Sequence, residues 1–340
     1  MIIRAKAPLR IGLAGGGTDV SPYSDIYGGA ILNATVSLYA SATIEPRIDG
    51  KIILDAVDFG ERIELDATEE LEINGELDLL KGVYNRVIKD YVKKPLSFTL
   101  TTYVDAPKGS GMGSSSTITV AILGAFAEWL KLPLGEYDMA QLAYEIERKD
   151  LAMAGGKQDQ YAATFGGFNF MEFYKNDKVI VNPLRIKQEY INELEYSLLM
   201  YYTGTSRLSA NIIKKQSANF SKKSEKAIEA GHKLKEQAIM MKEALLTGRL
   251  DKLGEILDFG WQYKKQTASG ITNPMIDEIY EAVKKSGATG GKISGAGGGG
   301  FMTIYAPRNS RYKVMKTLEK FGGSVKRFTF TQDGMRSWSV

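Results

Sequence analysis

The segment PKGSGMGSSSTITVAILGAF, which runs from Pro107 to Phe126, joins an expected strand to an expected buried helix. Pro107 can end a strand, the alternating glycines can form a turn, and the serines open an apolar run. The N-terminus of a helix attracts anions through its free N–H groups and its dipole, and glycine lets the backbone approach them closely. The segment therefore predicts a site for a nucleotide triphosphate. The alternative is a simple turn in which Ser114 caps the helix.

The residue composition limits the chemistry that this chain can perform. The 340 residues include no cysteine, and the one histidine, His232, lies in a lysine-rich stretch that we predict to be a solvated helix face. Disulfides, thiol catalysis, a Ser-His-Asp triad and a histidine metal site are therefore excluded. Carboxylates, cations, hydroxyls and backbone N–H groups remain, and this set suits phosphoryl transfer.

The charge and hydropathy of the chain indicate its cellular compartment and the classes of partner to expect. There is no apolar run of about 18 residues, and the first residues lack the apolar core of a secretory signal. The absence of cysteine fits a reducing cytoplasm. A net charge of +4 favours small anionic molecules and gives little support for nucleic acid. We therefore expect a cytoplasmic protein with small-molecule substrates and with neither nucleic-acid nor membrane partners. A homodimer stays open.

The pattern of elements changes along the chain. Residues 1–185 alternate between short strands, such as the alternating stretch at 96–104, and helices expected near 114–131 and 139–151. Residues 209–247 have helical spacing and are rich in Lys, Glu, Ala and Leu. The start of a later helix is indicated by two residues. Asn273 can cap its N-terminus, and Pro274 suits its first turn. We predict two domains, over 1–186 and 187–340.

Three glycine-containing motifs resemble those of a known enzyme family. APLRIGLAGGGTD (7–19), PKGSGMGSSS (107–116) and KISGAGGGGF (292–301) follow in the order found in the GHMP kinases, which include galactokinase, homoserine kinase and mevalonate kinase. The resemblance spans nearly the whole chain. It implies a two-domain α+β fold, with an N-terminal domain like ribosomal protein S5 and a ferredoxin-like C-terminal domain. ATP and substrate are expected to meet in the cleft between them.

The resemblance also implies roles for single residues. Asp159, which follows a glycine turn, is the expected general base, and Arg10 is the expected cation beside it. Mg²⁺ is expected on Ser115 and Glu147. Without the family, Arg10 could instead form an ion pair at a strand end, and Glu147 could be a surface acid paired with Arg148. The residues expected to bind the ATP phosphates are Gly109, Gly111, Gly113, Ser114, Ser115 and Ser116.

The acceptor is expected to be a sugar. Asp19 matches the aspartate that binds sugar hydroxyls in the galactokinase motif GEHTD, but Gly16 and Gly17 replace its Glu-His pair and leave more room. The first motif, with GGKQDQYAA and TGTSR, most resembles the D-glycero-D-manno-heptose 7-phosphate kinases. These enzymes phosphorylate the anomeric hydroxyl of a sugar that already carries a phosphate, during synthesis of nucleotide-activated heptose. Fucokinase-like enzymes and non-catalytic sensors with this fold are the alternatives.

A second phosphate on the acceptor requires cations in addition to those that bind ATP. Lys157, close to Asp159, and Arg207, in TGTSR, are the candidates, since Arg suits bidentate contacts and Lys a point contact. Arg207 could instead pack at the start of a helix. Gly297 and Gly298, in the third motif, are expected to close over the substrate, or simply to form a tight entry to a strand.

Overall fold

The computed structural model describes residues 1–204 and 209–340, and its larger sheet supports the first half of the chain. Among the described residues this sheet joins eight strands in the order β12-β1-β2-β5-β3-β4, with β6 and β7 added beside β2. Burial alternates along β4 and β5, whereas the second part of β1 and the first part of β2 are buried at consecutive residues and so are covered on both faces. The strands are β1 (Ile3–Ala14), β2 (Gly29–Pro46), β3 (Lys51–Ala56), β4 (Glu61–Asp66), β5 (Phe98–Val104), β6 (Phe168–Phe173), β7 (Val179–Pro183) and β12 (Arg336–Ser339).

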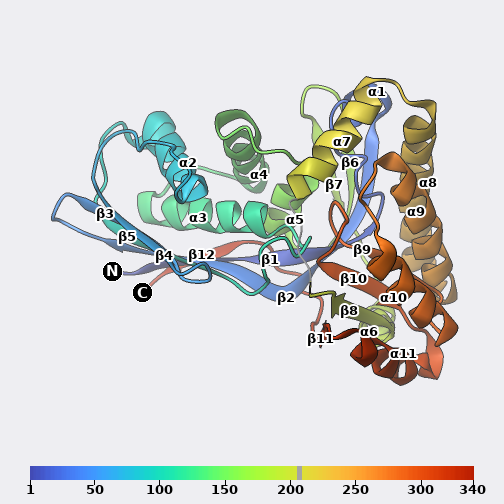
Figure 1. Ribbon diagram of the computed structural model, residues 1–340. Helices are drawn as coiled ribbons and strands as arrows, with labels where there is room; N and C mark the ends of the chain where they lie inside the picture. Colours follow the sequence, from blue (N-terminus) through green and yellow to red (C-terminus); the bar gives the residue numbers. More distant parts are fainter. Residues whose placement is uncertain (205–208) are drawn as a thin grey trace.

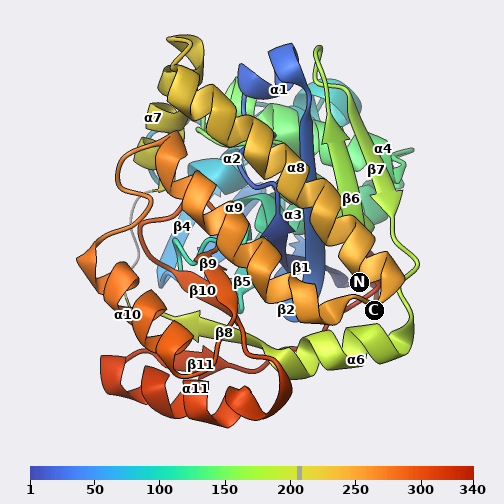
Figure 2. The same cartoon turned by 90° about the vertical axis from the view of Figure 1, so that its right-hand side faces the viewer.

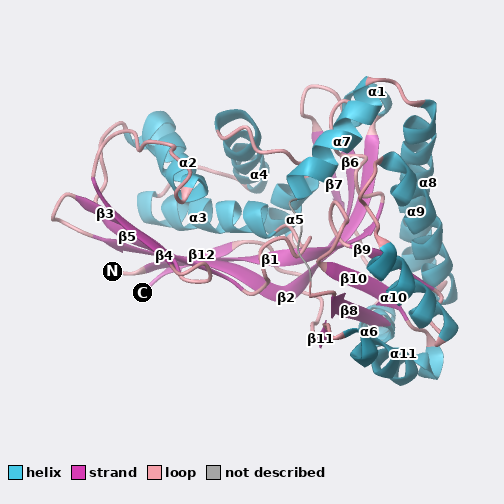
Figure 3. Ribbon diagram, in the orientation of Figure 1, coloured by secondary structure: helices cyan, strands magenta, loops and turns pink. Residues whose placement is uncertain are grey.

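One face of this sheet carries helices (Figure 3). They are α2 (Asp78–Val87), α3 (Ser114–Leu130), α4 (Glu136–Glu145) and α5 (Gln158–Phe165). The helix α3 packs on the sheet and also contacts α2, α4 and α5, which explains why its sequence is apolar around most of its circumference. Its Phe126 is fully buried and meets the Phe98 ring edge-on at 5.4 Å. The predicted burial of this helix is confirmed.

A smaller antiparallel sheet forms in the second half of the chain, in the order β11-β8-β10-β9. This is the strand order of a ferredoxin-like fold, so the expected α+β architecture is confirmed. Its strands are β8 (Leu198–Tyr202), β9 (Gly290–Ile293), β10 (Phe301–Tyr305) and β11 (Ser324–Lys326). The remaining helices are α1 (Tyr23–Tyr27), α6 (Gln188–Ser197), α7 (Ser209–Ser221), α8 (Glu225–Thr247), α9 (Leu253–Thr267), α10 (Pro274–Lys285) and α11 (Arg311–Leu318). Figure 2 shows α8 and α9 crossing in front of β1 and β2.

Local signals in the sequence located most elements correctly. Asn273 caps α10 as predicted, because its Oδ1 accepts a hydrogen bond of 3.0 Å from the Ile276 N–H. The helix expected over 139–151 begins earlier, at Glu136, and becomes a π-helical turn over Ile146–Asp150. His232 lies on an exposed face of α8 as predicted. No helix in the described ranges is long and apolar enough to cross a membrane.

The chain returns to its first sheet at its C-terminal end. β12 pairs antiparallel with β1, with Ser339 opposite Ile3, so both termini lie at the same edge of the molecule (Figure 1). Met335 packs on α3 so closely that a Cβ on Gly124 would lie 2.4 Å from its sulfur. The last residues of the predicted 187–340 domain therefore complete the sheet of the first domain. The two halves are joined by this strand as well as by the connection near residue 186.

Candidate active site

A cavity of about 670 Å³ brings together segments from the whole length of the chain. Arg10, Gly17 and Asp19 line it from the first motif, and the second motif lines it through Lys108 and the glycines and serines that follow. The segment from Glu147 to Asp159 forms another wall. The sequence-predicted convergence of the three motifs on one cavity is therefore seen in the structure.

The second motif forms a loop in which glycine is required. Gly109, Gly111 and Gly113 have φ values of 74°, 78° and 78°, in the left-handed region that favours glycine. Gly113 is the residue before α3 and no side chain caps this helix, so Ser114 is not the cap that the alternative interpretation required. The first N–H groups of α3 therefore stay open for an anion. The predicted phosphate-binding residues that line the cavity are Gly109, Gly111, Gly113, Ser114, Ser115 and Ser116.

The third motif lies directly on this loop. The Phe301 N–H donates to the Ser110 carbonyl at 3.0 Å, and a Cβ on Gly300 would lie only 2.5 Å from the same oxygen. Gly295 and its neighbour line the cavity. The predicted substrate residues Gly297 and Gly298 do not, because the Gly298 N–H donates to the backbone of residue 271.

Arg10 and Asp159 form an ion pair at the centre of the cavity wall. Arg10 Nη2 lies 2.6 Å from Asp159 Oδ1, and Arg10 Nε donates to the same oxygen at 2.7 Å. Arg10 Nη1 donates to the Gly111 carbonyl at 2.6 Å. The Asp159 side chain is 23% exposed and faces the cavity, whereas Arg10 is buried. The pair holds a carboxylate beside the open N-terminus of α3.

Ser115 and Glu147 form a second pair in the same cavity. Ser115 Oγ donates to Glu147 Oε1 at 2.7 Å, and the Gln160 amide donates to the other carboxylate oxygen. Glu147 is fully buried and so is not a surface acid, but it does pair with Arg148, whose Nη1 lies 3.8 Å from Glu147 Oε1. One hydroxyl and one carboxylate fit Mg²⁺, which takes few protein ligands and binds phosphate oxygens as well. The described residues contain no group of three acidic or histidine side chains that could hold a metal alone.

Asp19 contributes to the cavity and to its construction. Its Oδ2 accepts hydrogen bonds from the Lys157 and Gln158 N–H groups, at 2.9 and 3.1 Å, at the start of α5. A Cβ on Gly156 would lie 1.9 Å from this oxygen, so glycine is required there. Asp19 therefore lines the cavity as predicted and also fixes the helix turn that carries Asp159.

Of the two cations predicted to bind the acceptor phosphate, only Lys157 lies within the described residues. The buried Lys157 ammonium lies 3.1 Å from Asp177 Oδ1 and 3.4 Å from Asp25 Oδ1, and Lys157 does not line the cavity. Because two carboxylates already neutralise it, we leave Lys157 out of the phosphate site. Arg207 lies outside the described residues.

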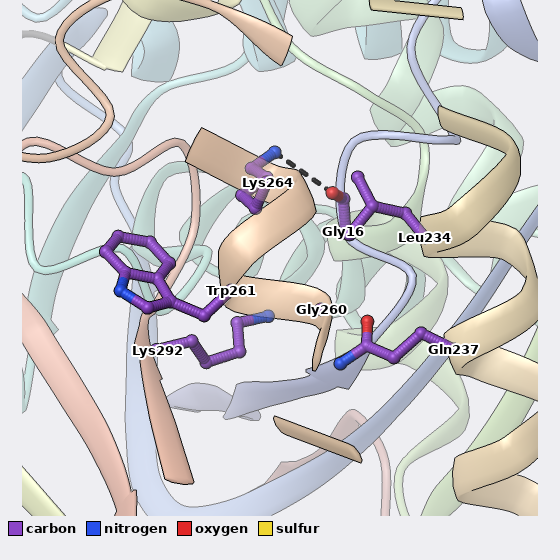
Figure 4. Close-up of a pocket in the computed structure, with 7 residues that line it drawn as sticks. All are labelled: Gly16, Leu234, Gln237, Gly260, Trp261, Lys264 and Lys292. Atoms are coloured by element: carbon purple, nitrogen blue, oxygen red, sulfur yellow. Dashed lines mark hydrogen bonds between the residues drawn. The ribbon is translucent and has the colours of Figure 1, made fainter. Parts of the chain in front are cut away.

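Of two buried lysines that the sequence did not single out, Lys264 lines the cavity, and Lys292 lines a small second pocket together with Lys264 and Gly16. Lys264 Nζ donates to the Gly16 carbonyl at 3.0 Å, and Lys292 points into the same region from β9 (Figure 4). Burial lowers the pKa of Lys264 to about 8. Burial, together with the positive charges of Lys264 and Arg10, lowers the pKa of Lys292 to about 7. The only sequence signal was the Gly16-Gly17 pair, which indicated unfilled space.

Comparison with known proteins agrees with the motifs. Residues 78–167 match the family model described as GHMP kinases N terminal domain, and 241–323 match the one described as GHMP kinases C terminal. The chain is 50% identical over 338 residues to the D-glycero-alpha-D-manno-heptose 7-phosphate kinase of Campylobacter jejuni, covering 99% of both. The crystal structure of a D-glycero-D-manno-heptose 1-phosphate kinase from Bacteroides thetaiotaomicron is 48% identical, with a TM-score of 0.85 over 99% of both chains.

The fucokinase likeness is weaker. The bifunctional fucokinase/GDP-fucose pyrophosphorylase of Arabidopsis thaliana is 26% identical over 329 residues, covering 92% of this chain and 30% of that protein. The heptose kinases are therefore about twice as similar in sequence and match along their whole length.

The depressed lysine pKa values predict how stability depends on pH. Between pH 7 and 10.5 the unfolded chain keeps the Lys292 proton and the folded chain loses it, so stability rises with pH over this window. Lys292→Met removes this dependence. We expect the variant to be more stable than the unmodified protein at pH 7, with a difference that shrinks toward pH 10.

Urea unfolding from pH 7 to 10, in buffer without phosphate, measures this difference. Lys285→Met, which removes an exposed lysine, is the matched control and should show no such trend. A Lys292→Met variant that is less stable at pH 7, or whose difference does not change with pH, contradicts the electrostatic account.

Proposed function

The chain belongs to the GHMP kinase family, and on this premise we propose that it phosphorylates the anomeric hydroxyl of D-glycero-D-manno-heptose 7-phosphate. The family uses ATP, so the products are ADP and heptose 1,7-bisphosphate. The observation that carries the proposal is the Arg10–Asp159 pair in the cavity that the three motifs share. The whole-length similarity to heptose kinases supports the choice of sugar.

Asp159 is the proposed catalytic carboxylate. A hydroxyl that attacks the γ-phosphorus must be aimed in line and must lose its proton. Asp159 can orient that hydroxyl and accept the proton. Arg10 holds the carboxylate in place, while the Gly111 carbonyl fixes the guanidinium from its other side.

The second motif is the proposed binding site for the ATP phosphates. Its glycine loop and the open N-terminus of α3 present backbone N–H groups to the cavity. Ser115 and Glu147 would hold Mg²⁺, which neutralises charge on the phosphates when it is bound. We assign residues 1–186 to the nucleotide-binding domain and 187–340 to the domain that closes over the substrates.

A non-catalytic sensor is the second candidate. Such a protein would not need a buried cation pairing a carboxylate at the cavity wall. Arg10, Asp159, Ser115 and Glu147 are all present and in contact as two pairs, which favours turnover.

The first test is substrate choice. We expect ADP release with D-glycero-D-manno-heptose 7-phosphate, and phosphorus NMR should show a new anomeric phosphate. The unphosphorylated heptose and L-fucose should react poorly. Equal kcat/KM for the free sugar and its 7-phosphate would favour a fucokinase-like acceptor, and the absence of ADP release with every sugar would favour a sensor.

The second test concerns the carboxylate. Asp159→Asn should keep ATP binding and lower kcat by about 10²–10⁴-fold, because a general base contributes about that much. Calorimetric titration with ATP and steady-state kinetics measure the two effects. The control is Asp251→Asn, at an exposed aspartate whose side chain is 70% accessible. A near-normal kcat in the Asp159 variant would remove this residue from catalysis.

The third test concerns the metal. Ser115→Ala and Glu147→Gln should each raise the Mg²⁺ concentration needed for half-maximal activity, since each removes one oxygen from a small ligand set. Glu145→Gln is a matched control, because Glu145 is two residues away and pairs with Lys149 outside the cavity. If both cavity variants keep the normal Mg²⁺ requirement, the metal site is elsewhere.

A further inference from the structure

We propose that Lys264 and Lys292 form the subsite for the phosphate that the acceptor sugar already carries. This assignment rests on the proposed function for the identity of the sugar, but the anion site itself rests on the geometry of the two lysines.

The two lysines are buried without a negative partner. Lys264 is 6% exposed and Lys292 is 8% exposed, and neither forms an ion pair within the described residues. Lys264 has one polar contact, with a neutral carbonyl, and Lys292 Nζ has no hydrogen-bond partner in the same ranges. Lysine is almost never buried unless it is paired. The other buried lysines have clear partners, since two aspartates neutralise Lys157 and Lys81 Nζ donates to the Asn74 amide oxygen at 2.6 Å.

The backbone around the lysine ends is built to admit them. A Cβ on Gly17 would lie 2.6 Å from Lys264 Nζ, so a side chain at this position would displace the ammonium. A Cβ on Gly16 would lie 3.7 Å from Lys292 Nζ. The buried Gln216 Nε2 would be 2.4 Å from the same Gly17 Cβ, and it is another donor without an acceptor. Lys264 Nζ and Gln216 Nε2 therefore crowd Gly17, whereas Lys292 Nζ lies at ordinary contact distance from a Cβ on Gly16 or on Gly12. An anion is the ligand that would satisfy these donors.

Lys264 is shared by the main cavity and a small second pocket, and Lys292 lines only the second. Lys264 lines the main cavity together with Gly17 and Asp19, and it also lines a small pocket of about 10 Å³ with Lys292 and Gly16 (Figure 4). That pocket has room for about one water-sized atom, so it can receive one phosphate oxygen. No residue of the ATP-phosphate loop lines it. The lysine pair is therefore a second cationic region, separate from the loop.

The charges match a phosphate monoester. Such a group carries a charge of about −1.5 to −2 near pH 7. Two lysines can balance that charge, and binding would favour their protonated forms. A neutral sugar would leave both cations unpaired in the complex.

The experiment compares two acceptors in two variants. Lys264→Met and Lys292→Met should each lower kcat/KM for heptose 7-phosphate by on the order of 30-fold or more, the cost of losing one partner of a buried charge pair. The weak activity on unphosphorylated heptose and the KM for ATP should change little. Lys285→Met, at an exposed position, is the control and should match the unmodified enzyme.

A second experiment measures phosphate binding, so that the anion site is tested independently of the identity of the sugar. With ADP present to fill the nucleotide site, inorganic phosphate should raise the Tm of the unmodified protein and of Lys285→Met, but not of the two cavity variants. If heptose 7-phosphate fails as a substrate while this pattern holds, the sugar assignment is wrong and the anion site stands. If heptose 7-phosphate is used and the variants match the unmodified enzyme in both arms, the subsite is refuted. Equal losses with both acceptors also refute it, because the lysines would then act on a group that both reactions share.

Discussion

The contacts of Arg10 fix the catalytic geometry of this protein. Its guanidinium joins β1 to Asp159, 149 residues away, and to the carbonyl of Gly111, 101 residues away. Its backbone N–H also donates to the Met112 carbonyl at 3.2 Å. A charged pair that is largely buried is costly to break, because each partner would be left without compensation. The distance between the carboxylate and the loop of the second motif therefore depends on Arg10, together with Asp19, which holds the start of α5.

Close contact between the loops of the second and third motifs explains why both are rich in glycine. A Cβ on Gly111 would lie 2.4 Å from the Ser294 carbonyl, and one on Gly300 would lie 2.5 Å from the Ser110 carbonyl. No side chain can be placed between these backbones. The loops of the second and third motifs are consequently in direct backbone contact, and the glycines permit this approach.

The sequence predicted what depends on local pattern or on family resemblance. The cap at Asn273 is a local signal, and the Arg10–Asp159 contact followed from matching a motif. Lys157 was predicted to bind the acceptor phosphate from its nearness in sequence to Asp159, but its ammonium contacts Asp25 and Asp177, because sequence proximity does not tell where a side chain points. Lys264 stands beside another lysine in a polar helix and looks like a surface residue. Its burial arises only when α9 packs against the first motif, and no local pattern reports such packing.

The buried lysines make acceptor recognition a property of both halves of the chain. Lys264 and Lys292 come from α9 and β9 of the second half, whereas Gly16 and Gly17 belong to the first. Near Arg10 the positive charge is balanced by Asp159, but at the lysine end only Asp19 acts on Lys264, from beyond ion-pair distance. An anionic acceptor would supply the missing charge and hold the two halves together at that point. A side chain in place of Gly17 would enter the space of the Lys264 ammonium, so this glycine and the buried lysine together favour a charged sugar.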